Sequence, residues 1–163
     1  MKHFSVRRLA LCAMVAALYA LLTILTASFA YGPIQFRLAE ALGVLPLFLP
    51  YTSWGLIAGC LLANLFSTVT ALDIVVGTAA TALSCLLVVR WRKTWVAILA
   101  PVVCNGLLVG AMLSWVYLPA AQFLYGLALY GAEVAAGELA VMLALGLPLQ
   151  LVLRRTGLCR SWE

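Results

Sequence analysis

The sequence predicts an all-α integral membrane protein, folded as a compact bundle of six transmembrane helices with both termini in the cytoplasm. The 163 residues are 66% hydrophobic and only 9% charged, with a mean hydropathy of +1.14. An ordinary soluble domain carries about a quarter charged residues, which excludes that class. Because a spanning helix needs roughly 20 residues, six would use about 120 and leave about 43 for loops and tails. We therefore expect residues 1–163 to form one transmembrane domain.

The first apolar segment is predicted to be a retained helix rather than a cleaved signal peptide. Its basic flank resembles that of a signal peptide, but the apolar run continues to about Ala30. That run exceeds the 7–15 residues typical of a signal peptide, and no convincing A-x-A cleavage site follows it.

Prolines, glycines and basic clusters divide the chain into six predicted helices, at about residues 6–30, 38–49, 53–70, 72–89, 95–118 and 132–153. The second is too short to span a bilayer unaided. Taken as one helix, residues 120–153 would be about 51 Å long, at 1.5 Å per residue. Because the bilayer core is about 30 Å thick, we expect residues 120–131 to form an outer loop or cap.

The basic residues predict the orientation. Nine of the ten stand in three clusters, Lys2/Arg7/Arg8, Arg90/Arg92/Lys93 and Arg154/Arg155/Arg160. Six crossings place all three clusters on one side, with Arg37 alone opposite. The positive-inside rule then predicts that both termini are cytoplasmic. We expect a multi-pass protein of the cell membrane.

Several function classes lack their motifs. The sole histidine, His3, lies in the predicted cytoplasmic tail, which removes histidine-based triads and HExxH sites. The sequence GxxxxGK[ST] is absent, so no ATP-binding P-loop is expected. The five cysteines include no C-x-x-C pair, and we expect no disulfide, metal site or cofactor. An enzyme is therefore not expected.

Charged residues beside long apolar runs are the main functional clue, because such residues usually pair, line a cavity or contact a ligand. Arg37 and Glu40, three residues apart, could neutralise each other. Asp73 could cap the helix it begins, and Glu133 could simply be hydrated near the outer surface. Glu138 is harder to dismiss, since it lies deeper and far from the basic clusters.

Other residues have two possible roles. Asn64 and Asn105 could join helices by hydrogen bonds or belong to a polar site that opens outward. The aromatic residues near the predicted outer face could form an interfacial belt or stack on a planar ligand; they include Trp115, Tyr117, Tyr125 and Tyr130. Ala13 and Ala17 form a small-residue face on the first helix, suited to packing inside the bundle or against a partner.

Four blocks together resemble the QueT family of predicted queuosine-precursor transporters. Residues 32–46 (GPIQFRLAEALGVLP) resemble the entry to that family's second helix, and residues 55–66 (GLIAGCLLANLF) resemble its third. Residues 72–81 (LDIVVGTAAT) are similar to its fourth helix, and Gly137-Glu138 with residues 146–149 (GLPL) to its sixth. The blocks occur in family order and cover roughly residues 10–153.

The resemblance implies a substrate-binding S component of an energy-coupling-factor (ECF) transporter. Such components capture a micronutrient outside the cell and couple to a transmembrane T component and two cytoplasmic ATPase subunits. They carry an Ala-x-x-x-Ala face on the first helix for the T component, matched here by Ala13 and Ala17.

The ligand implied is a 7-deazaguanine, either queuine or a precursor. Its adjacent N1–H and 2-amino donors suit a carboxylate, with Glu138 the first choice and Glu40 the second. Donors to the O6 atom could come from Gln35, Arg37, Asn64 or Asn105, and a cationic aminomethyl group could pair with Asp73 or Glu133. Phe36, Trp115 or Tyr130 would stack on the heterocycle. The alternatives are an S component for another flat vitamin (pterin, flavin or thiamine) and a structural or assembly membrane protein without a ligand.

Overall fold

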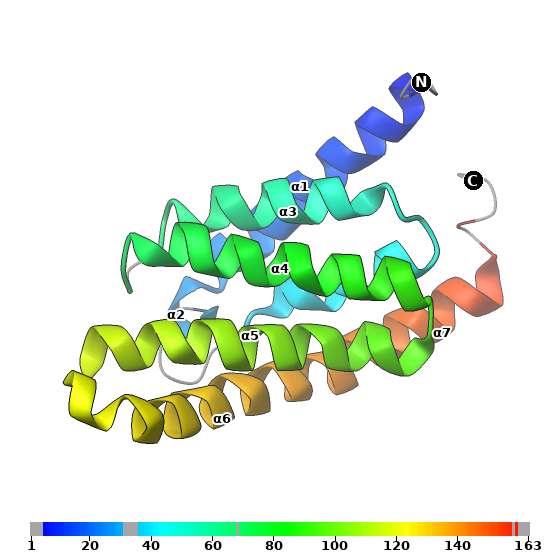
Figure 1. The fold of residues 1–163 in the computed structure, drawn as a ribbon. Coiled ribbons are helices and arrows are strands. Elements are labelled where there is room, and N and C mark those ends of the chain that lie inside the picture. Colours follow the sequence, from blue (N-terminus) through cyan, green and yellow to red (C-terminus); the bar gives the residue numbers. More distant parts are fainter. Residues whose placement is uncertain (1–4, 31–35, 68, 158, 160–163) are drawn as a thin grey trace.

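The computed structural model describes residues 5–30, 36–67, 69–157 and 159, and within these ranges it is helical without strands (Figure 1). The elements are α1 (Val6–Leu25), α2 (Ala27–Ala30), η1 (Leu38–Leu47), α3 (Thr52–Asn64), α4 (Leu72–Trp91), α5 (Thr94–Tyr117), η2 (Ala120–Gln122), α6 (Phe123–Val141), η3 (Met142–Gly146) and α7 (Leu147–Thr156). Here η1 and η2 are 3-10 helices and η3 is a π-helical segment.

Four helical runs are long and apolar enough to cross a membrane: Val6–Leu25, Leu72–Trp91, Thr94–Tyr117 and Ala120–Thr156. The other two segments of the predicted six, η1 and α3, have 10 and 13 residues. They lie among the longer helices and complete the bundle (Figure 1). The all-helical class and the shortness of the second helix agree with the sequence prediction, and the protein has the architecture of a multi-pass membrane protein.

Residues 120–131 were expected to form an outer loop or cap, and the loop is wrong. The chain stays helical from Ala120 to Thr156, and the turn between α5 and α6 extends beyond the neighbouring turns (Figure 1). The two helices touch at their backbones, since a Cβ added to Gly110 would lie 2.5 Å from the Cα of Gly131. This pairing supports α6 along its length, and a helix longer than the hydrocarbon core can continue into the headgroup region. Farther along, η3 accommodates Pro148, which lacks the N–H that a regular helix needs.

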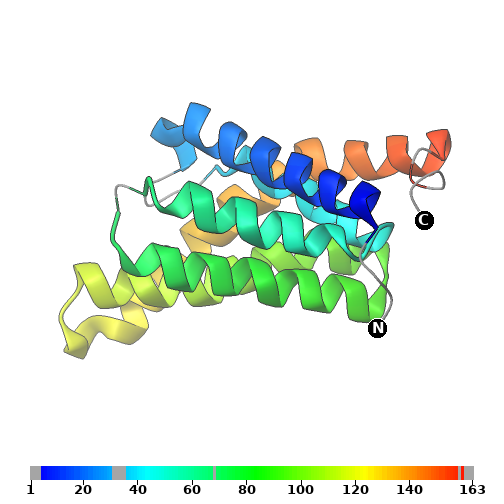
Figure 2. The same cartoon turned by 90° about the horizontal axis from the view of Figure 1, so that it is seen from above.

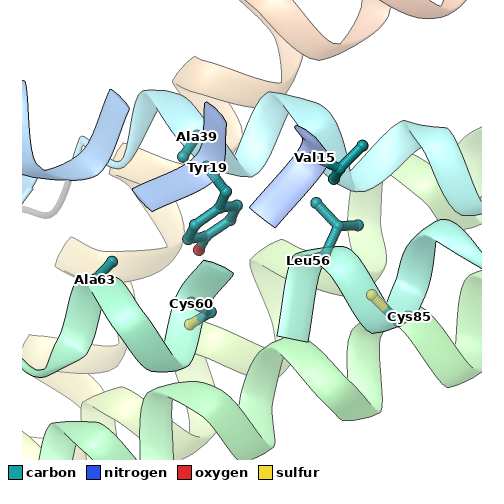
Figure 3. Packing of buried hydrophobic residues seen from close by; sticks show 7 residues of the cluster. All are labelled: Val15, Tyr19, Ala39, Leu56, Cys60, Ala63 and Cys85. Atoms are coloured by element: carbon teal, nitrogen blue, oxygen red, sulfur yellow. The ribbon is translucent and has the colours of Figure 1, made fainter. Parts of the chain in front are cut away.

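Close packing of α1 against α3 depends on two glycines. A Cβ on Gly55 would lie 2.5 Å from the carbonyl oxygen of Cys12, and one on Gly59 would lie 2.7 Å from that of Ala16. Tyr19 inserts between these helices beside Cys60 and belongs to the same core cluster as Leu56 (Figure 3). Small residues therefore let the two backbones approach closely, as they do in other membrane helix pairs.

The small-residue face formed by Ala13 and Ala17 is not used inside this bundle. Both residues are exposed, as are their neighbours Met14 and Leu18, whereas Cys12 and Ala16 on the inner side of α1 are buried. The packing alternative considered for Ala13 and Ala17 is thus wrong for the described residues, and their side of α1 is available for lipid or a partner.

The described residues of the three basic clusters lie at one end of the molecule. The start of α1, the turn between α4 and α5, and the end of α7 are together at that end in both views (Figures 1 and 2). They carry all the basic residues of the described ranges except Arg37. An even number of crossings accounts for this arrangement.

We predict that this basic end faces the cytoplasm, because positive charge near spanning helices is retained on that side. In a cysteine-free background, the Thr156→Cys variant should resist a membrane-impermeant maleimide in intact cells and react after the cells are opened. The Gln122→Cys variant, exposed at the opposite end, should react in intact cells and serves as the control. Efficient labelling of residue 156 in intact cells would contradict the orientation.

Candidate functional site

A buried ion pair joins η1 to α4. The Nη2 atom of Arg37 lies 3.0 Å from Oδ2 and 3.3 Å from Oδ1 of Asp73, and these side chains are 1% and 0% exposed. The Ser67 hydroxyl donates to Asp73 Oδ2 at 2.7 Å. Arg37 therefore makes its salt bridge with Asp73 rather than with Glu40. The alternative in which Asp73 caps its helix is also wrong, because α4 has no side-chain cap.

Local backbone geometry explains this pairing. Arg37 immediately precedes η1 in an extended conformation (φ −81°, ψ 90°), so the helical i, i+3 spacing that would bring it to Glu40 does not apply. One turn after Asp73, Gly77 leaves the space that the pair occupies. A Cβ on Gly77 would lie 3.0 Å from Asp73 Oδ1, 3.5 Å from Arg37 Nη1 and 2.6 Å from Asn64 Nδ2.

Asn64 links the end of α3 to the first turn of α4. Its side-chain Nδ2 donates to the backbone carbonyl of Asp73 at 3.0 Å, which satisfies an interhelical bond of the kind expected for a membrane asparagine. Its Oδ1 is buried and has no hydrogen-bond partner. Asn64 thus joins two helices and still presents an unused acceptor.

The carboxyl group of Glu40 is held by α1. The Tyr19 hydroxyl donates to Glu40 Oε1, and the two residues are 1% and 2% exposed. This contact links the inner side of α1 to η1. Sequence reasoning did not identify Tyr19, because an isolated tyrosine in an apolar helix is equally typical of an interfacial or core position.

Glu138 and Asn105 bring α6 and α5 into the site. Asn105 Nδ2 donates to Glu138 Oε1 at 2.8 Å, and Glu138 is fully buried. Glu138 lies within electrostatic range of both Glu40 and Arg37. We call the residues Tyr19, Arg37, Glu40, Asn64, Asp73, Asn105 and Glu138 the buried polar cluster. Six helical elements (α1, η1, α3, α4, α5 and α6) and the residue before η1 contribute to it.

Three atoms of the buried polar cluster lack hydrogen-bond partners, namely Asn64 Oδ1, Asn105 Oδ1 and Glu138 Oε2. All three are acceptors. A buried acceptor without a donor costs about 1–3 kcal/mol, and more if it is charged. The cluster is therefore chemically suited to receive a molecule rich in N–H or O–H donors. Among the described residues, no group of three His, Cys, Asp or Glu side chains is placed to hold a metal ion.

The remaining candidate residues are not all near the cluster. Phe36, 39% exposed, adjoins Arg37, whereas Gln35 lies outside the described residues. Tyr130 is half-buried, with its ring centroid 6.0 Å from that of Tyr117. Trp115 is 69% exposed and lies edge-on to Phe123. It is about 15 Å farther along α5 than Asn105, so the structure does not bring it together with the cluster.

Two smaller residues that support the cluster, Ser67 and Gly77, were also missed by sequence reasoning. Gly77 had a detectable signal, because it follows Asp73 by four residues and so lies on the same side of the helix. Ser67 had no comparable signal. It lies after the end of α3, and its contact with Asp73 depends on the path of the connecting segment.

The profile of the family described as QueT transporter matches residues 9–155, from α1 through α7. The chain belongs to the QueT transporter family. The match includes every residue of the buried polar cluster and confirms the resemblance found in the sequence. Comparison with curated proteins and with solved structures gives no significant match. As a QueT-family chain, the protein is a membrane transporter protein rather than a member of an enzyme family.

We predict that the Arg37→Gln and Asp73→Asn variants each lose about 3–5 kcal/mol of stability, because either change leaves one buried charge uncompensated. The double variant should lose less than the sum, since it removes both charges. Thermal unfolding of the purified protein in detergent measures this. Arg154→Gln is the control: this exposed arginine bonds Thr94 at 2.6 Å and should change stability by less than about 1 kcal/mol. Additive losses in the double variant would show that the pair is not coupled.

Proposed function

We propose that the chain is the substrate-binding S component of an ECF importer, capturing queuine or another 7-deazaguanine from outside for ATP-driven uptake. The observation that carries the proposal is the set of unpartnered acceptors in the buried polar cluster. Family membership supports transport, and the donor-rich edge of a guanine-like ring is a chemical match to buried oxygen acceptors.

The pairing of Asn105 with Glu138 favours this kind of edge. The amide Nδ2 of Asn105 donates to Glu138, and the atoms of these two side chains that lack any partner are both oxygens, Asn105 Oδ1 and Glu138 Oε2. The N1–H and 2-amino groups of a 7-deazaguanine are adjacent donors, and hydrogen bonds to a carboxylate are about twice as strong as neutral ones. Glu138 remains the first choice for this recognition, with Glu40 second.

The same contacts revise the other expected roles. Asn64 Nδ2 donates both to the Asp73 carbonyl and to Cys60 Sγ, which disfavours Asn64 as the donor to O6. Asn105 uses one of its two N–H groups on Glu138 and remains a candidate. Arg37 has five N–H donors and could serve the ligand beside Asp73. Because Asp73 already accepts from Arg37 and Ser67, Glu133 is the better candidate for a cationic aminomethyl group. Its Oε2 is buried without a partner.

The exposed side of α1 supports a role for a partner. Ala13 and Ala17 leave a shallow strip between larger neighbours, where another transmembrane helix could approach closely. We assign this strip to the T component. Because the sequence lacks a P-loop, the two cytoplasmic ATPase subunits would supply the energy through that contact.

A pterin is the strongest alternative ligand, since it also carries neighbouring ring and amino N–H donors that would suit the same acceptors. Flavin and thiamine are further alternatives in the same class. In a structural protein without a ligand, the unpartnered buried acceptors would lower stability and serve no function. A calorimetric panel of queuine, its precursors, a pterin, riboflavin and thiamine separates these possibilities.

We predict that Glu138→Gln weakens binding of queuine or its precursors by about 2–4 kcal/mol, or about 30- to 1,000-fold. The amide replaces one acceptor by a donor that would face the ligand's own donors. Glu133→Gln is the control, because Glu133 is half-exposed and lies about 140° around α6 from Glu138. It should change the affinity for uncharged queuine analogues by less than about 1 kcal/mol. Equal affinities of wild type and Glu138→Gln, measured by calorimetry, would move recognition to Glu40.

We predict that Ala13→Trp or Ala17→Trp blocks uptake while ligand binding by the isolated protein is unchanged. The added bulk separates helices that must pack closely. Ala79→Trp places the same bulk at an exposed alanine on α4 and should leave uptake intact. Uptake by cells expressing the whole transporter, together with calorimetry on each variant, tests this. Loss of ligand binding by Ala13→Trp would show that the substitution damages the bundle itself.

A further inference from the structure

The basic end of the molecule contains a cavity outside the buried polar cluster. Its volume is about 420 Å³, and it lies between the start of α1, the turn from η1 to α3, and the end of α4. Arg8 and Arg92, which are 84 residues apart, line it together with Tyr51 and residues 48–50. The described lining includes two arginines and no carboxylate, and we call this space the cationic cavity.

Two features fix the arginines at this place. The Arg8 guanidinium lies 5.3 Å from the centroid of the Tyr51 ring, within the range of a cation–π interaction. Arg92 ends α4 in the left-handed conformation (φ 48°), where glycine is usual. Arg92 is the only non-glycine residue in the described ranges with a positive φ. The chain thus places a guanidinium at a position that costs conformational energy.

An apolar crevice adjoins the cationic cavity. It has a volume of about 160 Å³ and is lined mainly by aliphatic side chains from α1, η1 and α7, with Leu11, Val15, Leu45 and Leu153 among them. Leu49 lines both spaces. The cavity and the crevice therefore meet at Leu49.

The depth of the cavity in the membrane follows from the aromatic residues around it. Trp54, Trp91 and Trp95 are all exposed at this end, near the starts of α3 and α5 and the end of α4. Tryptophan side chains concentrate at the level of the lipid headgroups. The cationic cavity therefore lies at the depth of lipid phosphates, and the crevice extends from it into the apolar bundle.

We propose that the cavity and the crevice form a binding site for one anionic phospholipid, with its phosphate between Arg8 and Arg92 and part of an acyl chain against Leu49. Guanidinium groups bind phosphate oxygens in paired hydrogen bonds. Basic pockets between transmembrane helices are suited to anionic headgroups. The charged and apolar compartments together favour a lipid over a free phosphate ion or an acidic protein segment. This site is independent of the proposed transport substrate.

The test uses the full-length protein in detergent, with native mass spectrometry to count bound lipid after addition of phosphatidylglycerol or phosphatidylcholine. Wild type should retain phosphatidylglycerol preferentially. In the Arg8→Gln/Arg92→Asn variant the preference should fall about tenfold or more, because each arginine near a lipid phosphate contributes about fivefold. Asparagine is used at position 92 because it tolerates the left-handed conformation. Arg155→Gln, which removes an exposed arginine outside the cavity, should keep the wild-type preference.

A second measurement separates the sources of phosphate. Phosphatidylglycerol should raise the thermal unfolding temperature of wild type and Arg155→Gln but not of the double variant. Glycerol 3-phosphate at the same concentration should have no such effect. Equal protection by glycerol 3-phosphate would overturn the lipid assignment in favour of a free anion. An equal lipid preference in wild type and the double variant would overturn the site. If wild type shows no preference for phosphatidylglycerol over phosphatidylcholine, the lipid site is also overturned. An acidic segment of a partner would then be the better candidate for the cavity.

Discussion

The buried pair of Arg37 and Asp73 is the constraint around which the polar interior of this bundle is arranged. Moving either charge out of water costs several kcal/mol, so each must be compensated where it lies. The pair spans the segment before η1 and the first turn of α4, and it requires the space left by Gly77 and the hydroxyl of Ser67. Such a pair adds little net stability compared with apolar packing. What the contact does is join the segment before η1 to the first turn of α4.

This neutralisation has a consequence for the two other buried acids. Because Arg37 is paired with Asp73, the direct partners of Glu40 and Glu138 are neutral groups, the Tyr19 hydroxyl and the Asn105 amide. Neutral donors satisfy only part of the capacity of a carboxyl group, which accepts up to about four hydrogen bonds when ionised. Within the buried polar cluster, the atoms without partners are therefore all acceptors. If the cluster binds the proposed ligand, the number and position of the ligand's N–H groups would be the first requirement for a match.

The features that the sequence predicted correctly depend on averages over many residues. Hydropathy and charge along the whole chain determine the helical class, the number of helical segments and the position of the basic residues at one end. No single contact can change these features. The errors arose where one contact decides. Residues 120–131 were expected to form an outer loop or cap because of length alone, but they are helical, and Gly131 at their end packs against the backbone of Gly110. Arg37 was considered as a partner of Glu40 because a regular helix was assumed where the backbone is extended.

Prediction of the candidate site from the sequence has the same limit, because it finds polar residues but not their partners. Asp73, Asn64, Asn105 and Glu138 could be found from the sequence, because polar residues in apolar helices are rare and costly. Their partners could not, since the bonds cross between helices. Asn105 and Glu138 are 33 residues apart, and Arg37 and Asp73 are 36 apart. Local spacing contains no information about such pairs until the packing is known.

Helix α1 has two faces with different contacts. Its inner face contacts the buried polar cluster, and its outer face is exposed. On the inner face Tyr19 donates to Glu40, and Gly59 of α3 packs against Ala16. On the outer face Ala17 is exposed only two residues before Tyr19, a rise of about 3 Å along the helix. A helix held by backbone hydrogen bonds moves as a unit over such a distance. A displacement of the α1 backbone at Tyr19 would therefore also displace the exposed side of α1 at Ala17.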